Sequence, residues 1–179
     1  MKNVILGVTG SIAAYKACDV ANELTKSGYS VKVIMTEAGK KFVAPLSFMT
    51  LTKNKVYTDM FGNLEPERVE HIALAEEADL FVICPASADF IAKAAAGIAD
   101  DMLTTSYLAY INKPVILCPA MNTNMYENPA TQRNLEILKE RGVIVIEPKV
   151  DYLACGSVGR GALENTDVII KAIKDLLGD

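Results

Sequence analysis

The stretch LCPAMNTNMYEN, residues 117–128, is the most informative part of this 179-residue sequence. It begins as an apolar run typical of a buried strand and stops at Pro119, after which Asn122, Asn124, two methionines and a tyrosine follow. In an open parallel sheet, ligands bind in the crevice outside the carboxyl ends of the strands. Asn122 and Asn124 offer amides that can donate to a carboxylate or phosphate. The stretch therefore predicts either a ligand-binding lip or a plain strand-to-helix turn in which an asparagine caps the following helix.

Four other short apolar runs have the composition of buried parallel strands. Segments with the helical spacing of apolar residues lie between them. This alternation of strand and helix patterns predicts an α/β fold. We expect a single Rossmann-like domain over residues 1–179, with a doubly wound parallel sheet and helices on both faces. The five expected strands are residues 4–8, 31–35, 78–84, 114–118 and 143–146.

The composition limits the partners and the compartment. The chain is 51% hydrophobic, enough for a full core, and its net charge of -4 gives no broad basic surface for a nucleic acid or an anionic membrane. Four cysteines without a CxxC spacing favour neither a zinc site nor a disulfide scaffold, and no apolar run approaches the roughly 20 residues of a membrane span. We therefore expect no nucleic acid, membrane or metal, and a cytoplasmic location. The cysteines are Cys18, Cys84, Cys118 and Cys155.

The turn after the first expected strand offers a site for an anion. Gly10 permits close approach of the backbone to a ligand, and Ser11 can cap a helix whose amide end attracts a phosphate. Capping alone would also explain Ser11. The spacing is not the G-x-G-x-x-G of dinucleotide-binding proteins, and no acidic residue lies at the very tip of the second strand, so NAD is disfavoured.

Three further features could serve a ligand or a reaction. His71 is the only histidine and suits proton transfer near neutral pH, although a lone histidine is more often structural. The segment between residues 147 and 164 holds Cys155 among three glycines, which predicts a long loop that acts as a mobile flap. Asp101 and Thr104 offer polar contacts to a ligand, or else belong to a solvated surface.

Five segments together resemble the flavin-containing cysteine decarboxylases, and the resemblance covers essentially the whole chain. The most specific segment is the Pro-Ala-Met-Asn-x-x-Met-Tyr block that begins at Pro119. The flap departs from the family pattern, because it lacks the Asp that more often follows the cysteine and the Gly-Arg-Met ending. The five segments are residues 10–16, 85–89, 99–104, 119–126 and 153–156.

The resemblance implies FMN bound between the subunits of a homo-oligomer, either a trimer or a dodecamer built from trimers. The resemblance also implies the catalytic roles of three residues. His71 matches the family's essential histidine, Asn122 matches the residue that holds the substrate carboxylate, and Cys155 matches the flap cysteine of the second half-reaction. Substrate contacts are expected from Asn122, Met125, Ala154 and Gly156. FMN contacts are expected from Gly10, Ser11, Ile12, Thr36, Ser87, Asp89, Asp101 and Thr104.

The activity that the resemblance implies is FMN-dependent decarboxylation of a small molecule, 4'-phosphopantothenoylcysteine, to 4'-phosphopantetheine in coenzyme A biosynthesis. The substrate thiolate is oxidised to a thioaldehyde, carbon dioxide leaves as an enethiolate forms, and the reduced flavin returns its electrons, with Cys155 as proton donor. A separate synthetase could act as its partner, since bifunctional relatives continue into such a domain.

Three alternatives share the fold: a peptidyl-cysteine decarboxylase of lantibiotic maturation, a flavin prenyltransferase, and a flavin-binding regulatory subunit without activity. Cys155 argues against the first, because that reaction needs no final reduction. Asn122 and Cys155 argue against the second, and the full set of His71, Asn122 and Cys155 argues against the third.

Overall fold

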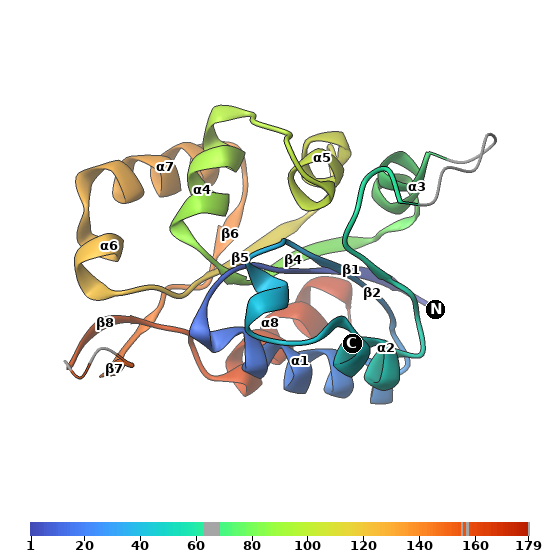
Figure 1. Ribbon diagram of the computed structural model, residues 1–179, viewed down its shortest axis with the longest axis horizontal. Helices are drawn as coiled ribbons and strands as arrows, with labels where there is room; N and C mark the ends of the chain where they lie inside the picture. Colours follow the sequence, from blue (N-terminus) through green and yellow to red (C-terminus); the bar gives the residue numbers. More distant parts are fainter. Residues whose placement is uncertain (63–68, 155, 157, 179) are drawn as a thin grey trace.

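The computed structural model describes residues 1–62, 69–154, 156 and 158–178. A six-stranded parallel sheet with the order β3-β2-β1-β4-β5-β6 forms the centre of the molecule (Figure 1). This is the Rossmann strand order, in which the sheet grows outward from β1 on one side and from β4 on the other. The strands are β1 (Asn3–Val8), β2 (Ser30–Met35), β3 (Val56–Tyr57), β4 (Leu80–Ala86), β5 (Val115–Pro119) and β6 (Ile144–Val145).

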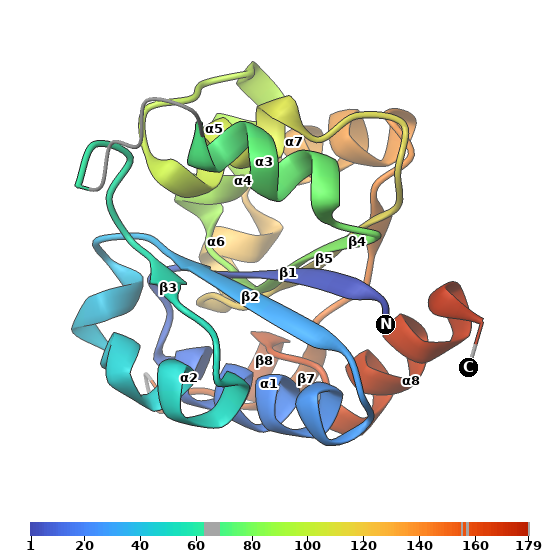
Figure 2. The same ribbon diagram turned by 90° about the vertical axis from the view of Figure 1, so that its right-hand side faces the viewer.

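Helices cover both faces of the sheet (Figure 2), which explains why its strands are so apolar. In β1, Val4 and Leu6 enter the core on one face, while Ile5 enters the core on the other. The expected α/β fold is therefore confirmed. One core is closed by α1 (Lys16–Lys26), α2 (Pro45–Thr52) and α8 (Thr166–Leu177), and the other by α3 (Glu70–Glu77), α4 (Ala88–Ala96), α5 (Met102–Ala109) and α7 (Pro129–Glu140).

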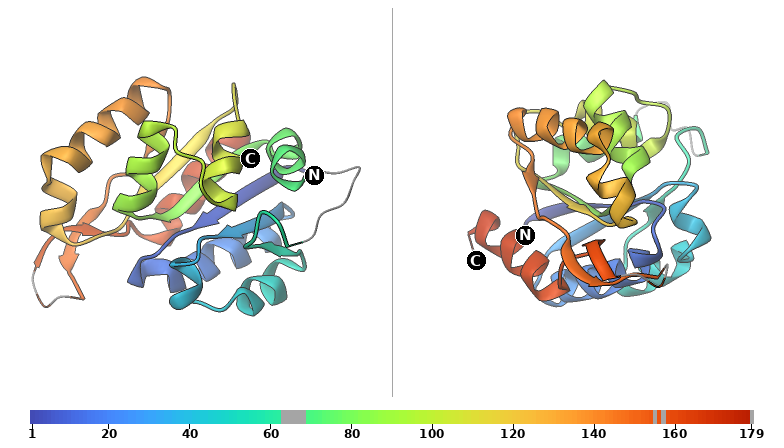
Figure 3. Two further views of the ribbon diagram at one scale, coloured as in Figure 1. Left: turned by 45° about the horizontal axis from the view of Figure 1, so that its top comes forward. Right: turned by 90° about the vertical axis from the view of Figure 1, so that its left-hand side faces the viewer.

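Most of the segment expected to be a long loop is instead a hairpin. Strands β7 (Lys149–Tyr152) and β8 (Val158–Ala162) pair antiparallel in a small sheet of their own. The expectation was wrong there because pairing within this segment leaves no periodic apolar pattern in its glycine-rich sequence. Figure 3 shows the hairpin beside the short helix α6 (Thr123–Glu127), outside the main sheet.

The ends of β1, β4 and β5 are tied together at the point where the sheet order reverses. The Thr9 hydroxyl donates to the Pro85 carbonyl oxygen (2.7 Å) and accepts from the Ser87 N–H (2.8 Å). The Ala120 N–H donates to the Ala86 carbonyl oxygen (3.1 Å). The turns that follow these three strands are therefore held at one edge of the sheet.

Candidate active site

A cleft of about 530 Å³ opens where these strand ends meet. Its position is the crevice in which doubly wound sheets bind their ligands. The walls come from the turn after β1, the start of α4, the lip (residues 120–126) and the β7-β8 hairpin. The lining side chains are mostly apolar with a few polar groups, which is typical of a small-molecule pocket. They fall within residues 10–16, 87–88, 120–125, 151–154 and 161–163, together with Phe42.

The wall formed by the turn after β1 contains Gly10 and Ser11, as the anion-site interpretation requires. Ser11 is the N-cap of the 3-10 helix η1 (Ile12–Tyr15), and its hydroxyl accepts from the Ala13 N–H (3.3 Å). Ser11 therefore caps a helix and lines the cleft at once. A Cβ on Gly10 would lie 2.5 Å from the Cβ of Ala38, so the turn packs against the segment after β2 only with glycine there.

The structure of the lip agrees with both interpretations of its sequence, a ligand-binding segment and a turn in which an asparagine caps a helix. Asn122 and Met125 line the cleft, whereas Asn124 does not. The Asn122 side chain caps α6 by accepting from the Asn124 N–H (2.9 Å). The next helix, α7, is capped separately by Asn128, whose side chain accepts from the Ala130 N–H (2.9 Å).

The hairpin forms another wall of the cleft and is docked on the lip through two glycines. The Met121 N–H donates to the Gly161 carbonyl oxygen (2.9 Å). A Cβ on Gly161 would collide with the Met121 carbonyl oxygen, and a Cβ on Gly159 would collide with the Thr123 hydroxyl. Only residues without a side chain let β8 approach the lip this closely.

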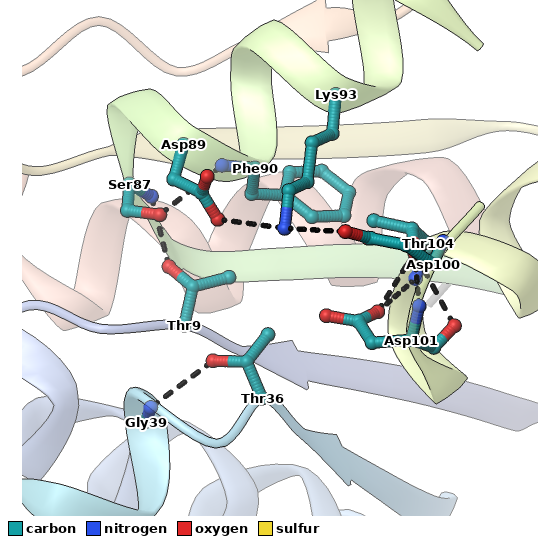
Figure 4. Close-up of polar contacts among 10 residues, drawn as sticks. All are labelled: Thr9, Thr36, Gly39, Ser87, Asp89, Phe90, Lys93, Asp100, Asp101 and Thr104. Atoms are coloured by element: carbon teal, nitrogen blue, oxygen red, sulfur yellow. Dashed lines mark hydrogen bonds and ion pairs between the residues drawn. The ribbon is translucent and has the colours of Figure 1, made fainter. Parts of the chain in front are cut away.

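A second polar group lies at the same edge of the sheet (Figure 4). Asp101 and Thr104 form a capping box at the start of α5: the Asp101 carboxylate accepts from the Thr104 N–H (2.7 Å) and hydroxyl (2.8 Å), and the Thr104 hydroxyl accepts from the Asp101 N–H (3.1 Å). Thr36, at the end of β2, accepts from the Gly39 N–H (3.0 Å). Thr36, Asp89, Asp101 and Thr104 do not line the cleft.

Lys93 joins the two helices that carry this polar group. Its ammonium lies 3.3 Å from the Asp89 carboxylate and 3.1 Å from that of Asp100 (Figure 4). Burial lowers the pKa of Lys93, but its contacts with Asp100 and Asp89 raise it more, so the net shift is upward. The side chain therefore stays charged and links α4 to the segment before α5.

Two further expected site residues do not line the cleft. His71 is the second residue of α3 and is partly buried, and Gly156 lies between β7 and β8. Cys155 lies outside the described residues. The other expected residues, Ile12, Ser87 and Ala154, line the cleft.

Several residues at this site were not anticipated. Thr9 directly follows a strand, as Thr36 does, and that position was the one available signal for it. Lys16 places a cation, and Asp151 an anion, in the cleft lining. Leu163 and Tyr152 of the hairpin region reach the cleft through long-range docking, for which the sequence carries no local signal.

The cysteines that the structure describes are free, and two of them, Cys84 and Cys118, are buried in the adjacent strands β4 and β5. Burial, together with the neighbouring Cys84, raises the pKa of Cys118 well above its ordinary value, so that thiol remains protonated. Across residues 1–62, 69–154, 156 and 158–178, no group of three or more His, Cys, Asp or Glu side chains could hold a metal. Those same ranges contain no helix long and apolar enough to span a bilayer.

The Flavoprotein family model matches residues 1–178, so the chain belongs to the Flavoprotein family. It is 49% identical over 177 residues to the probable phosphopantothenoylcysteine decarboxylase of Streptococcus mutans, a match that covers 98% of this chain and 99% of that relative. It is also 49% identical over 170 residues to the coenzyme A biosynthesis bifunctional protein CoaBC of Bacillus subtilis. That match covers 95% of this chain but 42% of the bifunctional protein, so the chain spans about two fifths of that relative's length.

Solved structures agree with this assignment. A cysteine-to-serine mutant of PPC decarboxylase, complexed with pantothenoylaminoethenethiol, superposes with a TM-score of 0.89 at 31% identity over 99% of both chains. The FMN-dependent cysteine decarboxylase SpaF superposes with a TM-score of 0.84 at 32% identity, over 99% of this chain and 98% of SpaF. The chain is thus a flavoprotein, and its relatives include decarboxylases.

Proposed function

We propose that this protein decarboxylates 4'-phosphopantothenoylcysteine to 4'-phosphopantetheine in coenzyme A biosynthesis. The observation that carries the proposal is the cleft at the reversal of the strand order, which brings the Ser11 turn, the Asn122 lip and the hairpin together. The full-length similarity to the Streptococcus mutans relative supports this substrate over a peptide.

The chemistry of the cleft fits FMN as the flavin. The amide ends of η1 and α4 converge on it, and helix amide ends together with serine hydroxyls suit a phosphate. Ser11 and Ser87 would hold the phosphate, while Ile12 and the Thr36 and Asp101 group would complete the site. Bound FMN would accept two electrons from the cysteinyl substrate, which makes loss of carbon dioxide feasible, and return them afterwards.

The chain's own residues would bind the substrate and move protons. The Asn122 amide would donate to the substrate carboxylate, and Met125 would supply an apolar wall beside it. His71 would transfer a proton near neutral pH. Because His71 does not line the cleft of its own chain, a neighbouring copy in a homo-oligomer would supply it, in keeping with a flavin bound between subunits.

The first test is the mass of the product after the flavin-loaded protein is incubated with 4'-phosphopantothenoylcysteine. Loss of carbon dioxide with no change in hydrogen count is the expected result. Loss of carbon dioxide with two hydrogens also missing would mean that only the oxidative half occurs, as expected for a peptide-modifying decarboxylase. An unchanged substrate would contradict the proposal.

Two substitutions test the assigned roles. His71→Asn should abolish release of carbon dioxide while flavin remains bound, as measured by flavin absorbance of the purified protein. Cys155→Ser should stop the reaction at the oxidised intermediate, detected as a product two hydrogens short. Full activity of either variant would remove that residue from the mechanism.

A further inference from the structure

A single carboxylate joins the lip to the hairpin. Glu147 lies between β6 and β7, and its carboxylate receives three donors from different elements. Lys139 of α7 lies 2.6 Å from Oε1, Arg160 of β8 lies 3.4 Å from Oε2, and the Tyr126 hydroxyl of the lip donates to Oε2. Glu147 thus bonds to α7, β8 and the lip at once.

Glu147, Lys139, Arg160 and Tyr126 form one cluster, and Tyr126 is its buried member. Tyr126 is 4% exposed, and the Gln132 side-chain amide donates to its carbonyl oxygen (2.6 Å). The Arg160 guanidinium lies 5.5 Å from the centre of the Tyr126 ring, and its Nε donates to the Pro148 carbonyl oxygen (3.4 Å). Arg160 therefore contacts both the lip and the first residues of the hairpin.

Near neutral pH the Glu147 carboxylate is ionised and the Tyr126 hydroxyl is protonated, so the contacts of this cluster persist. Burial works to raise the pKa of Glu147, but hydrogen bonds from Lys139 and Tyr126 and the nearby positive charges lower it overall. Burial, and then the bond to Glu147, raise the pKa of Tyr126 to about 12. The carboxylate therefore stays ionised and the tyrosine hydroxyl stays a donor.

This cluster is the second attachment of the hairpin to the lip. The first is the close contact of Gly161 with Met121, directly before Asn122. The cluster fixes Tyr126, four residues after Asn122. Asn122 therefore lies between two points at which the lip is held against the hairpin. These two attachments fix the cleft-lining residues of the lip relative to those of the hairpin.

We propose that Glu147 is a positioning residue: it holds the lip to the hairpin, so that Asn122 meets the substrate carboxylate in the geometry that the reaction needs. Glu147 does not line the cleft itself. The inference rests on the proposed decarboxylation, in which Asn122 binds the substrate, and it predicts a defect in substrate handling with intact flavin binding.

The test compares Glu147→Gln with the matched control Glu77→Gln. Both side chains are similarly exposed, at 37% and 39%, and both pair with a lysine, but Glu77 and its partner Lys32 lie at the opposite edge of the sheet from the cleft. Glu147→Gln should raise KM for the substrate by about tenfold, because a small misplacement of Asn122 would weaken its contact with the substrate carboxylate. Flavin affinity, followed by quenching of flavin fluorescence, should stay within about twofold of the parent protein.

Arg160→Gln provides a second variant, because Arg160 is half exposed and its loss should not prevent folding. It should raise KM in the same direction as Glu147→Gln, and Glu147→Asp should restore part of the loss. If the Glu147 and Arg160 variants match Glu77→Gln in KM, or if flavin affinity falls together with activity, the positioning role is wrong. Failure of the parent protein to release carbon dioxide would instead overturn the proposed function.

Discussion

The Thr9 hydroxyl uses both of its hydrogen-bonding directions at the reversal of the strand order. It is 1% exposed, so no water can replace its partners on Pro85 and Ser87. Ser87 in turn caps α4 and lines the cleft. A buried side chain that does not line the cleft thus sets the position of one that does.

Thr9→Val should weaken flavin binding by about tenfold, because it leaves a backbone donor and acceptor without partners at a cost of roughly 1–3 kcal/mol. Thr52→Val is the matched control. The Thr52 hydroxyl is also buried, donates to the Phe48 carbonyl oxygen (2.8 Å) and accepts from the Asn54 N–H (3.2 Å), but neither of these partners lines the cleft, whereas Ser87, the partner of Thr9, does.

Both variants should lose similar thermal stability, measured by calorimetry, and only Thr9→Val should lose flavin affinity, measured by fluorescence titration. Thr9→Ser keeps the hydroxyl and should bind flavin nearly as well as the parent protein. Equal flavin affinity in Thr9→Val and Thr52→Val would show that the strand tie has no bearing on the cofactor.

Ionised Glu147 should contribute to folding stability in a pH-dependent way. Its pKa is lowered in the folded protein, so its contribution is present above the ordinary value of 4.5 and is lost as pH falls through the folded pKa. The difference in unfolding free energy between the parent protein and Glu147→Gln should therefore be largest near pH 7 and shrink below about pH 4.5. Urea unfolding across that range measures it, and a difference that grows on acidification would contradict the assigned sign.

Polar residues directly after strands were predictable from the sequence. Ser11, Ser87 and Asn122 each follow an apolar run, and the carboxyl ends of parallel strands meet at one edge. The roles of Lys93 and Glu147 were not predictable, because each depends on partners that tertiary packing alone brings within bonding distance.

The hairpin depends on glycine where a backbone must approach another backbone. Gly161 has a φ of +150° and a Cβ there would meet the Met121 carbonyl oxygen. Gly161→Ala should therefore destabilise the protein by roughly 1–3 kcal/mol through overpacking and backbone strain. It should also raise KM for the substrate, because β8 would move away from the lip.

Gly142→Ala is the control for the backbone conformation alone. Gly142 has a φ of +86°, and a Cβ there would meet nothing within 4 Å. Its substitution should cost stability without changing KM, as measured by urea unfolding and steady-state kinetics. If Gly142→Ala changes KM as much as Gly161→Ala does, the docking of the hairpin does not govern the cleft.

The long central strands could be predicted because burial on both faces requires continuous apolar runs, as all seven buried residues of β4 illustrate. The edge strand β3 was missed because its two residues stand between polar residues, whereas the two residues of β6 belong to the longer apolar run 143–146. The hairpin was missed because its pairing brings Lys149 opposite Ala162 across a segment rich in glycine.

Large apolar side chains remain exposed in the isolated chain on η1, which lines the cleft, and on α2. Ile12 and Tyr15 on η1 are 59% and 58% exposed, and Leu46 on α2 is 69% exposed. We expect a second copy of the chain to cover them in a homotrimer or a dodecamer.

Leu46→Lys should reduce the oligomer mass measured by light scattering, because a charge would be buried at the contact. Leu176→Lys, on the exposed part of α8, adds the same charge elsewhere and should leave the mass unchanged. An unaltered mass for Leu46→Lys would place the contact on another surface.

The cleft draws on almost the whole length of the chain, from Gly10 in the first turn to Leu163 after the last strand. During synthesis, β1 and β2 can pair early, but the wall supplied by the hairpin cannot exist until residue 163 has left the ribosome. Completion of the substrate-binding cleft should therefore be a late event, after the sheet has formed. A nascent chain released at increasing lengths would bind the substrate only once the hairpin is complete, which makes substrate binding a reporter of finished folding.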